Sequence, residues 1–188
     1  MAFALQTDDW YLRQDIIWHK ANPIPESVRD RCTKAHEYIF LLSKSVKYFY
    51  DSEAIKETDS GTDHPRRILS GQPSLEPTNN LMPKHSGLRK ADGRIGQGRN
   101  KRSVWTISTQ PFPEAHFATF PPRLIEPCIL AGSPERGVVL DPFFGAGTTG
   151  YMCEVLNRKW IGIELNKKYC ELAARRIERE TRQMRLFN

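Results

Sequence analysis

A strand-like run that ends in a carboxylate and continues into a glycine-rich bend is the part of this sequence best suited to chemistry. Val138–Leu140 is followed by Asp141, and glycines then follow at G-x-G-x-x-G spacing from Gly145. Glycines in such a bend allow a tight turn and let a ligand approach the backbone. Glu164 lies 23 residues beyond Asp141, about where a carboxylate can bind the two hydroxyls of a ribose. The pattern predicts a site for an adenosine-type cofactor; the alternative is a strand-to-helix turn without a ligand.

The elements around this bend are too few to form a sheet by themselves. Hydrophobic periodicity predicts a helix over 149–156, a strand over 159–164 and a helix over 167–185, and only 38 residues follow Gly150. Two strands do not make a stable open sheet. The other strands must therefore come from earlier in the chain or from another chain, an unusual order for a dinucleotide-binding protein.

The bend also resembles a known motif. Asp141–Thr149 has the sequence DPFFGAGTT, which is similar to the S-adenosylmethionine (AdoMet) motif of DNA amino-methyltransferases, the enzymes that modify N6 of adenine or N4 of cytosine. The match resembles their β-group, in which the cofactor-binding half follows the catalytic half. Further segments resemble this family in the same order and cover most of the chain outside about 56–103: Asp15–Pro25, Lys34–Phe40, His116–Pro122 and Trp160–Leu165.

The resemblance implies an α/β fold of the Rossmann-like class I AdoMet-dependent methyltransferases, with permuted order, a sheet incomplete at the N-terminus and a loop-rich insert. It implies three parts: the remainder of the catalytic half (1–55), a DNA target-recognition insert (56–103) and the AdoMet-binding half (104–188). The implied AdoMet-binding residues are Thr119, Phe120, Asp141, Pro142, Phe143, Gly145, Gly147, Thr148, Glu164 and Leu165. A helix lead-in with Phe117 and Phe120 in the core is the alternative for the first of these segments. The residues implied to shape the pocket for a flipped base are Trp18, Lys20, Asn22 and Pro23.

Composition and charge limit the class of protein. The 188 residues are 39% hydrophobic and 27% charged, as in a soluble globular domain, and no apolar run approaches the ~20 residues of a membrane helix. Since no signal-peptide pattern opens the chain, we expect a cytoplasmic protein. The net charge of +6 and the pI near 9.2 favour a polyanionic partner. Because the cysteines lack metal-ligand spacing, we expect reduced thiols without disulfides or bound metal at Cys32, Cys128, Cys153 and Cys170.

A basic, glycine-rich segment is the candidate for contact with that partner. Residues 84–102 contain four glycines and a single acid, Asp92, among seven basic residues: Lys84, Arg89, Lys90, Arg94, Arg99, Lys101 and Arg102. Such a segment can lie along the phosphates of double-stranded DNA, and the resemblance places the target-recognition insert here. The alternative is a solvated charged loop. Because the insert is small, we expect a short recognition site or the help of a second subunit, as in a homodimer.

Short elements are predicted on either side of the insert. We expect the tail of a helix in Met1–Leu12, strands over 13–18 and 37–44, the second of them buried, and a hairpin strand at Tyr48–Tyr50. His36 fits a satisfied histidine at a strand start better than a catalytic base. After the insert we expect a helix over 123–132. On the last helix, we expect a packed face of Tyr169, Leu172, Ala173 and Ile177 and a solvated side of Arg175, Arg176, Arg179 and Arg182.

The catalytic loop of the resembled family, (Asp/Asn/Ser)-Pro-Pro-(Tyr/Phe/Trp), is missing from this sequence. The Pro-Pro pair of the present sequence lies in Phe120–Arg123. This segment has no polar acceptor before the pair and no aromatic residue after it. Three classes remain. The first is an enzyme completed by a separate upstream half, and the second is a noncatalytic AdoMet- and DNA-binding remnant. The third is a NAD-type oxidoreductase fragment, which the motif order disfavours.

Overall fold

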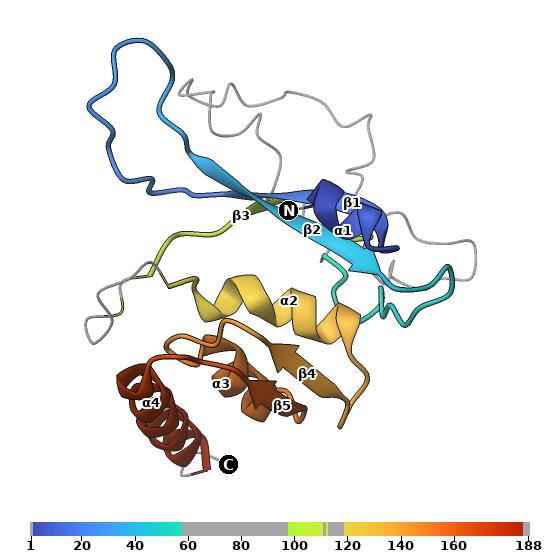
Figure 1. Ribbon diagram of the computed structural model, residues 1–188, viewed down its shortest axis with the longest axis vertical. Coiled ribbons are helices and arrows are strands. Elements are labelled where there is room, and N and C mark those ends of the chain that lie inside the picture. Colours follow the sequence, from blue (N-terminus) through green and yellow to red (C-terminus); the bar gives the residue numbers. More distant parts are fainter. Residues whose placement is uncertain (1, 58–97, 111, 113–118, 186–188) are drawn as a thin grey trace, which may run out of the picture. The chain divides into compact units, whose positions relative to one another are not determined.

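The computed structural model describes residues 2–57, 98–110, 112 and 119–185 (Figure 1). It divides into two compact units, one formed by Met1–Ile55 with Arg102–Asn188 and the other by Lys56–Lys101. In the second unit, the described residues Glu57 and Arg99 form an antiparallel bridge. The described helices and strands belong to the first unit: α1 (Ala2–Thr7), β1 (Tyr11–His19), β2 (His36–Ser43), β3 (Val104–Thr106), α2 (Pro122–Gly132), β4 (Val138–Asp141), α3 (Thr148–Val155), β5 (Lys159–Gly162) and α4 (Lys167–Arg185).

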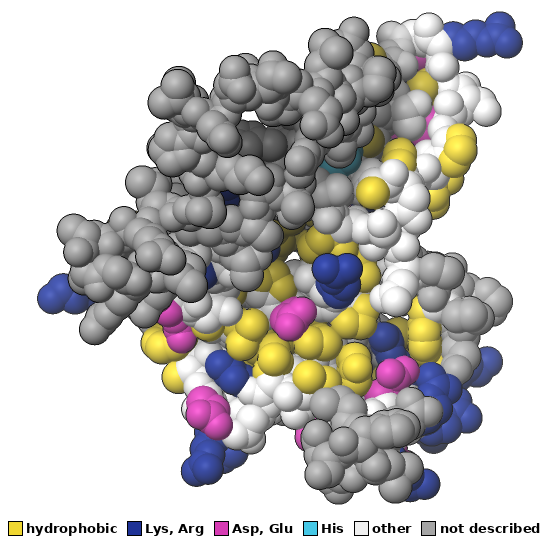
Figure 2. Space-filling model, turned by 180° about the vertical axis from the view of Figure 1, so that it is seen from behind, with side chains coloured by type: hydrophobic (Ala, Val, Ile, Leu, Met, Phe, Trp, Pro, Cys, Tyr) yellow, Lys and Arg dark blue, Asp and Glu magenta, His cyan; other side chains and the backbone are white. Residues whose placement is uncertain are grey.

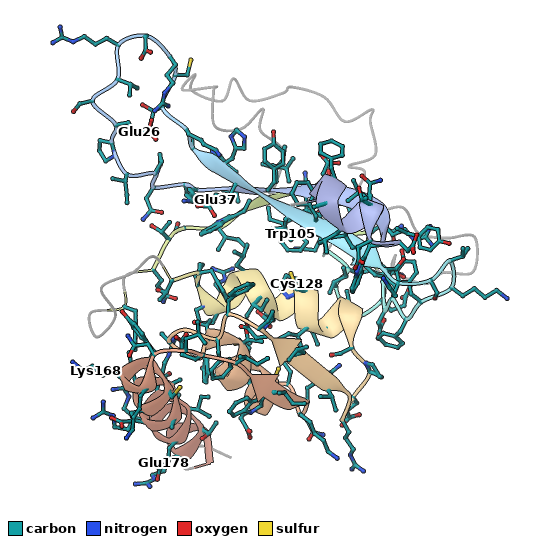
Figure 3. The ribbon with its side chains drawn as sticks, viewed as in Figure 1. Glu26, Glu37, Trp105, Cys128, Lys168 and Glu178 are labelled. Atoms are coloured by element: carbon teal, nitrogen blue, oxygen red, sulfur yellow. The ribbon has the colours of Figure 1, made fainter. Side chains whose placement is uncertain are left out.

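β1 is the central strand of a three-stranded sheet with the order β2-β1-β3. It pairs antiparallel with β2 and parallel with β3, so Trp18 lies beside Trp105. Both indoles are buried against Leu124 of α2, and together these residues form a first core. Figure 3 shows Trp105 on β3 and Cys128 on α2, which packs against the same core.

β1 has one irregularity near its start. Between Leu12 and Gln14 the pairing with β2 advances by one residue instead of two, so Arg13 is an extra residue in the strand. Such a β-bulge redirects one side chain while the rest of the strand keeps its register. The Arg13 guanidinium donates to Ser43 Oγ at 3.2 Å, and its Cζ lies 4.9 Å from the centre of the Tyr48 ring.

β4 and β5 form a parallel pair that carries the glycine-rich bend. One face of this pair packs against α2 and α3, where Val139 and Trp160 contact a second core of Ile129, Met152 and Cys153. Cys153 has no exposed surface, and burial raises the pKa of its thiol to about 11. The thiol therefore stays protonated at neutral pH and serves packing instead of nucleophilic chemistry.

The helix predicted over 123–132 is confirmed as α2 (Figure 1), and its side chains contact both cores. Pro121 lies at its N-cap and Pro122 in its first turn, where a missing N–H costs no intrahelical hydrogen bond. Leu124 belongs to the first core and Ile129 to the second. α2 therefore contributes side chains to the cores of both sheets.

The elements predicted after the bend are confirmed. The helix over 149–156 is α3, the strand over 159–164 is β5, and the helix over 167–185 is α4. The amphipathic period of α4 buries three of the four predicted residues, Leu172, Ala173 and Ile177, and leaves Tyr169 partly exposed.

One prediction for α4 is wrong. Arg175, Arg179 and Arg182 are exposed, as predicted, but Arg176 is only 7% exposed. Its guanidinium lies in the interior because it finds hydrogen-bond acceptors in the bend that precedes α3, which the sequence pattern does not reveal.

The predictions for the N-terminal part have mixed outcomes. The helix tail is confirmed as α1, and the strand over 13–18 is confirmed as β1. The strand over 37–44 is confirmed as β2, but the prediction that it is buried is wrong: Tyr38 is 52% and Phe40 is 39% exposed. Only the face of β2 that carries Ile39 packs against the first core, so a nearly continuous apolar run here does not mean burial on both sides.

The hairpin strand predicted at Tyr48–Tyr50 is wrong, since these residues form no strand. β2 ends at Ser43, whose hydroxyl donates to the Ser45 carbonyl at 2.9 Å. Hydrogen bonds of this kind compete with strand pairing and favour a turn. The aromatic residues that follow serve side-chain contacts, such as that of Tyr48 with Arg13.

The part of the chain that the structure describes includes none of the long apolar helices needed to span a bilayer. Among the same residues, no three His, Cys, Asp or Glu side chains are grouped to hold a metal ion. The four cysteines, Cys32, Cys128, Cys153 and Cys170, are free thiols.

Candidate functional site

The glycine-rich bend starts at the carboxyl end of β4, whose last residue is Asp141. Asp141 Oδ1 accepts a hydrogen bond from the Phe143 amide at 3.0 Å, and its Oδ2 accepts one from the Thr149 hydroxyl at 2.6 Å. The carboxylate thus joins the strand end to the first turn of α3. Asp141 fixes the shape of the bend by these contacts, whether or not it touches a ligand.

Gly145 and Gly147 give the bend its course. Their φ angles are 51° and 75°, in the left-handed region that favours glycine. A Cβ on Gly147 would lie 2.8 Å from the Cβ of Ala173 on α4, so this position has no room for a side chain. A Cβ on Gly145 would meet, among described atoms within 4 Å, the Phe143 carbonyl oxygen at 3.9 Å. As far as the described residues are concerned, the space beside Gly145 is therefore open to a ligand.

Glu164 follows β5 and turns its carboxylate toward this glycine. Its Oε2 accepts a hydrogen bond from the Gly145 amide at 2.9 Å, and its Oε1 accepts one from the Asn166 amide at 2.8 Å. A carboxylate oxygen can accept more than one hydrogen bond, so both oxygens can receive further donors. The two loops at the carboxyl ends of β4 and β5 thus present an oriented carboxylate beside the open space.

Two large apolar side chains, one in each of the loops after β4 and β5, are almost fully exposed. Phe143 is 83% exposed, and Leu165, which follows Glu164, is 99% exposed. Pro142 is exposed as well. Binding sites for small molecules combine apolar side chains with a few well-placed polar groups. The loops after β4 and β5 supply both kinds.

Arg176 is a residue of this region that the sequence predictions missed. Its Nη1 donates to the Ala146 carbonyl at 3.2 Å and to the Thr148 hydroxyl at 3.0 Å. A signal for its position existed, because it lies seven residues after Tyr169 and so falls on the packed face of the helix. The residue type indicated the opposite, since arginine is rarely fully buried.

Two other residues predicted for the cofactor site, Thr148 and Phe120, have packing roles. Thr148 is 4% exposed, and its hydroxyl is bonded to Arg176, so it faces α4. Phe120 packs against the first core, as in the alternative stated for it. Thr119 is partly exposed in the segment that leads to α2.

Among the residues predicted for the base pocket, Trp18 belongs to the interior. It is 5% exposed, and its indole N–H donates to the Ile107 carbonyl at 2.8 Å. The Lys20 ammonium lies 4.9 Å from the centre of the indole ring and pairs with Glu37. Trp18 therefore supports Lys20 and has little exposed surface, and its role in the base pocket stays a prediction.

Asn22, also predicted for the base pocket, is joined to the segment after β3. Its Oδ1 accepts a hydrogen bond from the Thr109 amide at 2.8 Å, and its Nδ2 donates to the Thr109 carbonyl at 3.4 Å. Pro23 follows in the same loop and is partly exposed. The structure thus brings Asn22 next to a segment 87 residues away in the sequence.

The basic residues predicted to contact DNA are only partly described. Lys84, Arg89, Lys90 and Arg94 lie outside the described residues, whereas Arg99, Lys101 and Arg102 lie within them. The Arg99 guanidinium pairs with Glu57 at 3.0 Å. The Arg102 carbonyl accepts the indole N–H of Trp105 at 2.7 Å, which holds the backbone at the start of β3.

Comparison with known sequences gives a consistent result. The profile of the N6_N4_Mtase family, described as DNA methylase, matches residues 1–175. The chain is 50% identical over 179 residues to the Type II methyltransferase M.SmaI of Serratia marcescens, a match that covers 95% of this chain and 50% of that protein. It is 44% identical over 180 residues to M.Cfr9I of Citrobacter freundii, with 96% and 49% covered. The chain spans about half the length of these relatives.

Solved structures share the fold. The PvuII DNA methyltransferase (cytosine-N4-specific) has a TM-score of 0.61 at 19% identity, over 95% of this chain and 58% of that one. The M1.HpyAVI-SAM complex has a TM-score of 0.57 at 23% identity, over 94% and 67%. These similarities confirm the predicted α/β methyltransferase fold. With a profile match over most of its length, the chain belongs to the N6_N4_Mtase family of DNA methylases.

Proposed function

We propose that this chain serves in a site-specific DNA methyltransferase of a restriction-modification system, which transfers the methyl group of AdoMet to N6 of adenine or N4 of cytosine in duplex DNA. One observation carries the proposal: the Gly145 and Asn166 amides hold the Glu164 carboxylate beside the glycine-rich bend. An oriented carboxylate suits a ribose, whose two hydroxyls are hydrogen-bond donors. The relatives M.SmaI and M.Cfr9I, both named Type II methyltransferases, support the reaction.

The residues of the bend fit AdoMet. Glu164 would bind the ribose hydroxyls, and the exposed side chains of Phe143 and Leu165 would cover apolar surface of the nucleoside. The open space beside Gly145 would receive the amino-acid end. Pro142, Gly147 and the backbone of Thr148 complete the proposed cradle, and Thr119 stays a prediction for the methionine end.

The reaction requires more than this cradle. When bound, AdoMet supplies an electrophilic methyl group on sulfur. The protein must hold the target amine in line with that methyl group, and the base must leave the duplex to reach it. The Pro-Pro pair of this sequence, Pro121–Pro122, lies at the start of α2 and is preceded by Phe120, which has no polar side chain to accept a hydrogen bond from the amine. The residues of the bend and of the loop after β5 therefore serve the cofactor side of the reaction.

The loop after β1 is the proposed place for the flipped base. The Lys20 ammonium is held by Glu37 and by the ring of Trp18, and the Asn22 side chain is held by Thr109. Polar side chains with fixed directions can recognise the edge of a base, because each base presents its own set of donors and acceptors. Lys20, Asn22 and Pro23 are the proposed pocket residues, with Trp18 as their support.

A second candidate is a noncatalytic AdoMet- and DNA-binding protein. For either candidate, a second polypeptide is favoured by the face of β4 and β5 that does not pack against α2 and α3, where Val138, Leu140, Ile161 and Ile163 are 59%, 58%, 55% and 49% exposed. Figure 2 shows hydrophobic side chains gathered over the part of the molecule that holds these strands. Parallel sheets are normally covered on both faces. The proposed occupant is the polypeptide that the relatives carry outside the matched region; a homodimer is the alternative.

A methyl-transfer assay tests the proposal and separates the two candidates. Transfer of tritiated methyl from AdoMet to mixed-sequence duplex DNA is measured for the chain alone and for the chain mixed with the part of M.SmaI outside the match. We expect activity only in the mixture, because the group that contacts the amine must come from outside this chain. Nucleoside analysis of the product then identifies the methylated base.

The control variant for this assay is Leu140→Lys, which places a charge on the exposed sheet face. We expect it to abolish the activity of the mixture while the affinity for S-adenosylhomocysteine, measured by calorimetry, stays unchanged. Transfer by the chain alone would contradict the need for a second polypeptide. Absence of transfer in every mixture, despite cofactor binding, would favour the noncatalytic candidate.

DNA binding by the basic segment is a separate prediction. Replacing Arg99, Lys101 and Arg102 together by glutamine should weaken duplex binding and lower the slope of log affinity against log salt by about 2 to 3, since each phosphate contact contributes ~0.9. Arg99 should contribute less to the slope than a full phosphate contact, because Glu57 already neutralises part of its charge. Fluorescence anisotropy of a labelled mixed-sequence duplex across a salt series measures the slope.

The matched control replaces Arg175, Arg179 and Arg182 of α4 by glutamine, which makes the same change in net charge on another element. This control should leave the slope close to that of the unaltered chain. Equal slopes for the two triple variants would show that net charge, and not the basic segment, governs the binding.

A further inference from the structure

Arg176 places a guanidinium in the interior, at the contact between α4 and the glycine-rich bend. The side chain is 7% exposed. Its Nη1 donates to the Ala146 carbonyl at 3.2 Å and to the Thr148 hydroxyl at 3.0 Å. Burial of a charged group is costly unless hydrogen bonds compensate it. The bend and the arginine therefore depend on each other.

The contact with Ala146 fixes one peptide plane of the bend. The carbonyl of the peptide between Ala146 and Gly147 is held by Arg176, and the N–H of the same peptide donates to the Phe144 carbonyl at 2.9 Å. Since both sides of the plane are bonded, it cannot rotate without breaking a hydrogen bond. Gly147 is thereby kept at its φ of 75°, and the course of the bend between the two glycines is set from α4.

The same guanidinium contacts a second segment. Its Cζ lies 4.3 Å from the centre of the Phe112 ring and 6.0 Å from that of the Tyr151 ring. A guanidinium over an aromatic face is attracted to the ring electrons, more strongly when both are shielded from water. Phe112 precedes Thr119, the residue predicted for the methionine end of the cofactor. Arg176 thus connects α4, the bend and the segment that leads toward α2.

We propose that Arg176 is a positioning residue for the amino-acid end of the cofactor. It acts through Ala146, Thr148 and Phe112, whereas the carboxylate of Glu164 is held by backbone amides of the two loops after β4 and β5. Loss of the guanidinium should therefore affect the two ends of the ligand unequally. The inference rests on the proposed function, because it requires AdoMet to bind at this bend.

The test compares two ligands that differ only at the end in question. S-adenosylhomocysteine carries the amino-acid end, and 5′-methylthioadenosine has the same nucleoside and sulfur without it. By calorimetry, we expect Arg176→Met to weaken S-adenosylhomocysteine binding by about 10-fold and 5′-methylthioadenosine binding by less than about 2-fold. Arg176→Lys retains a charged donor but not the planar fork, so it should recover part of the lost affinity for S-adenosylhomocysteine.

The matched control is Arg175→Met on the exposed side of α4, which should leave both affinities unchanged. If the Arg176→Met chain does not fold, as judged by circular dichroism, the ratio of the two dissociation constants is read from Arg176→Lys. An equal loss for both ligands, or no loss for either, would overturn the role of Arg176 while the proposed function stands. An unaltered chain that binds neither ligand would instead overturn the proposed function, and this inference with it.

Discussion

The Glu164→Ala chain is expected to bind S-adenosylhomocysteine at least about 100-fold more weakly than the unaltered chain, which corresponds to about 2.7 kcal/mol. Two hydrogen bonds from the ribose to a charged acceptor would be lost, and such bonds contribute about 1.5–3 kcal/mol each. The amides of Gly145 and Asn166 would lose their acceptor as well, so the two loops would be less well ordered around the ligand. Isothermal titration measures the loss directly.

Two further variants make this result specific. Glu171→Ala removes an exposed carboxylate from α4, close in the sequence to Glu164, and should leave the affinity unchanged. Glu164→Gln keeps one carbonyl acceptor and the size of the side chain, and should have an intermediate affinity. If Glu164→Ala binds as well as the unaltered chain, Glu164 does not contact the ribose.

The second large effect is on stability. Gly147→Ala should lower the free energy of unfolding by about 3 kcal/mol, from strain of a non-glycine residue in the left-handed region and from overpacking. The positive φ of 75° accounts for the first term. The added Cβ, 2.8 Å from that of Ala173, accounts for the second. Urea unfolding followed by circular dichroism gives the difference.

Removing the opposing methyl group separates these two terms. In the double variant with Ala173→Gly, the 2.8 Å contact with the Ala173 Cβ is removed but the strain at position 147 remains. A double-mutant cycle should therefore show a favourable coupling of at least ~1 kcal/mol between the two positions. As a control, Gly132→Ala adds a Cβ with no described neighbouring atom within 4 Å, and it should change stability by no more than about 0.5 kcal/mol. Additive effects at Gly147 and Ala173 would show that the conflict between them is absent.

The half of the fold around the bend was predictable because each of its elements has a strong local signal. α2 begins with proline, α4 repeats apolar residues at helical spacing, and β5 is a short apolar run next to the helix that precedes it. The position of Glu164 beside the bend was predictable as well. The separation of 23 residues between Asp141 and Glu164 corresponds to one strand–helix–strand unit, β4-α3-β5. The amides that hold Glu164 were not predictable, because they depend on how two loops meet in space.

The burial and exposure that the sequence did not predict have a common physical origin in tertiary contacts. Arg176 is buried because acceptors from a segment 28 to 30 residues away surround it, and Trp18 is buried because its N–H finds a carbonyl 89 residues away. Tyr38 and Phe40 are exposed for the opposite reason: they lie on the face of β2 away from the first core. A residue type or a periodic pattern carries no record of such distant partners.

Because Arg13 is an extra residue in β1, it could be deleted without changing the pairing of the rest of the strand. Because strand faces alternate, deletion of one residue between Gln14 and Trp18 would move Trp18 out of the first core and onto the opposite face. Deletion of Arg13 would instead leave Leu12 and Gln14 opposite successive residues of β2, with every later pair intact. Among related proteins, the first deletion would therefore reverse the two faces along part of β1, whereas the second would remove the hydrogen bond and the ring contacts of one arginine.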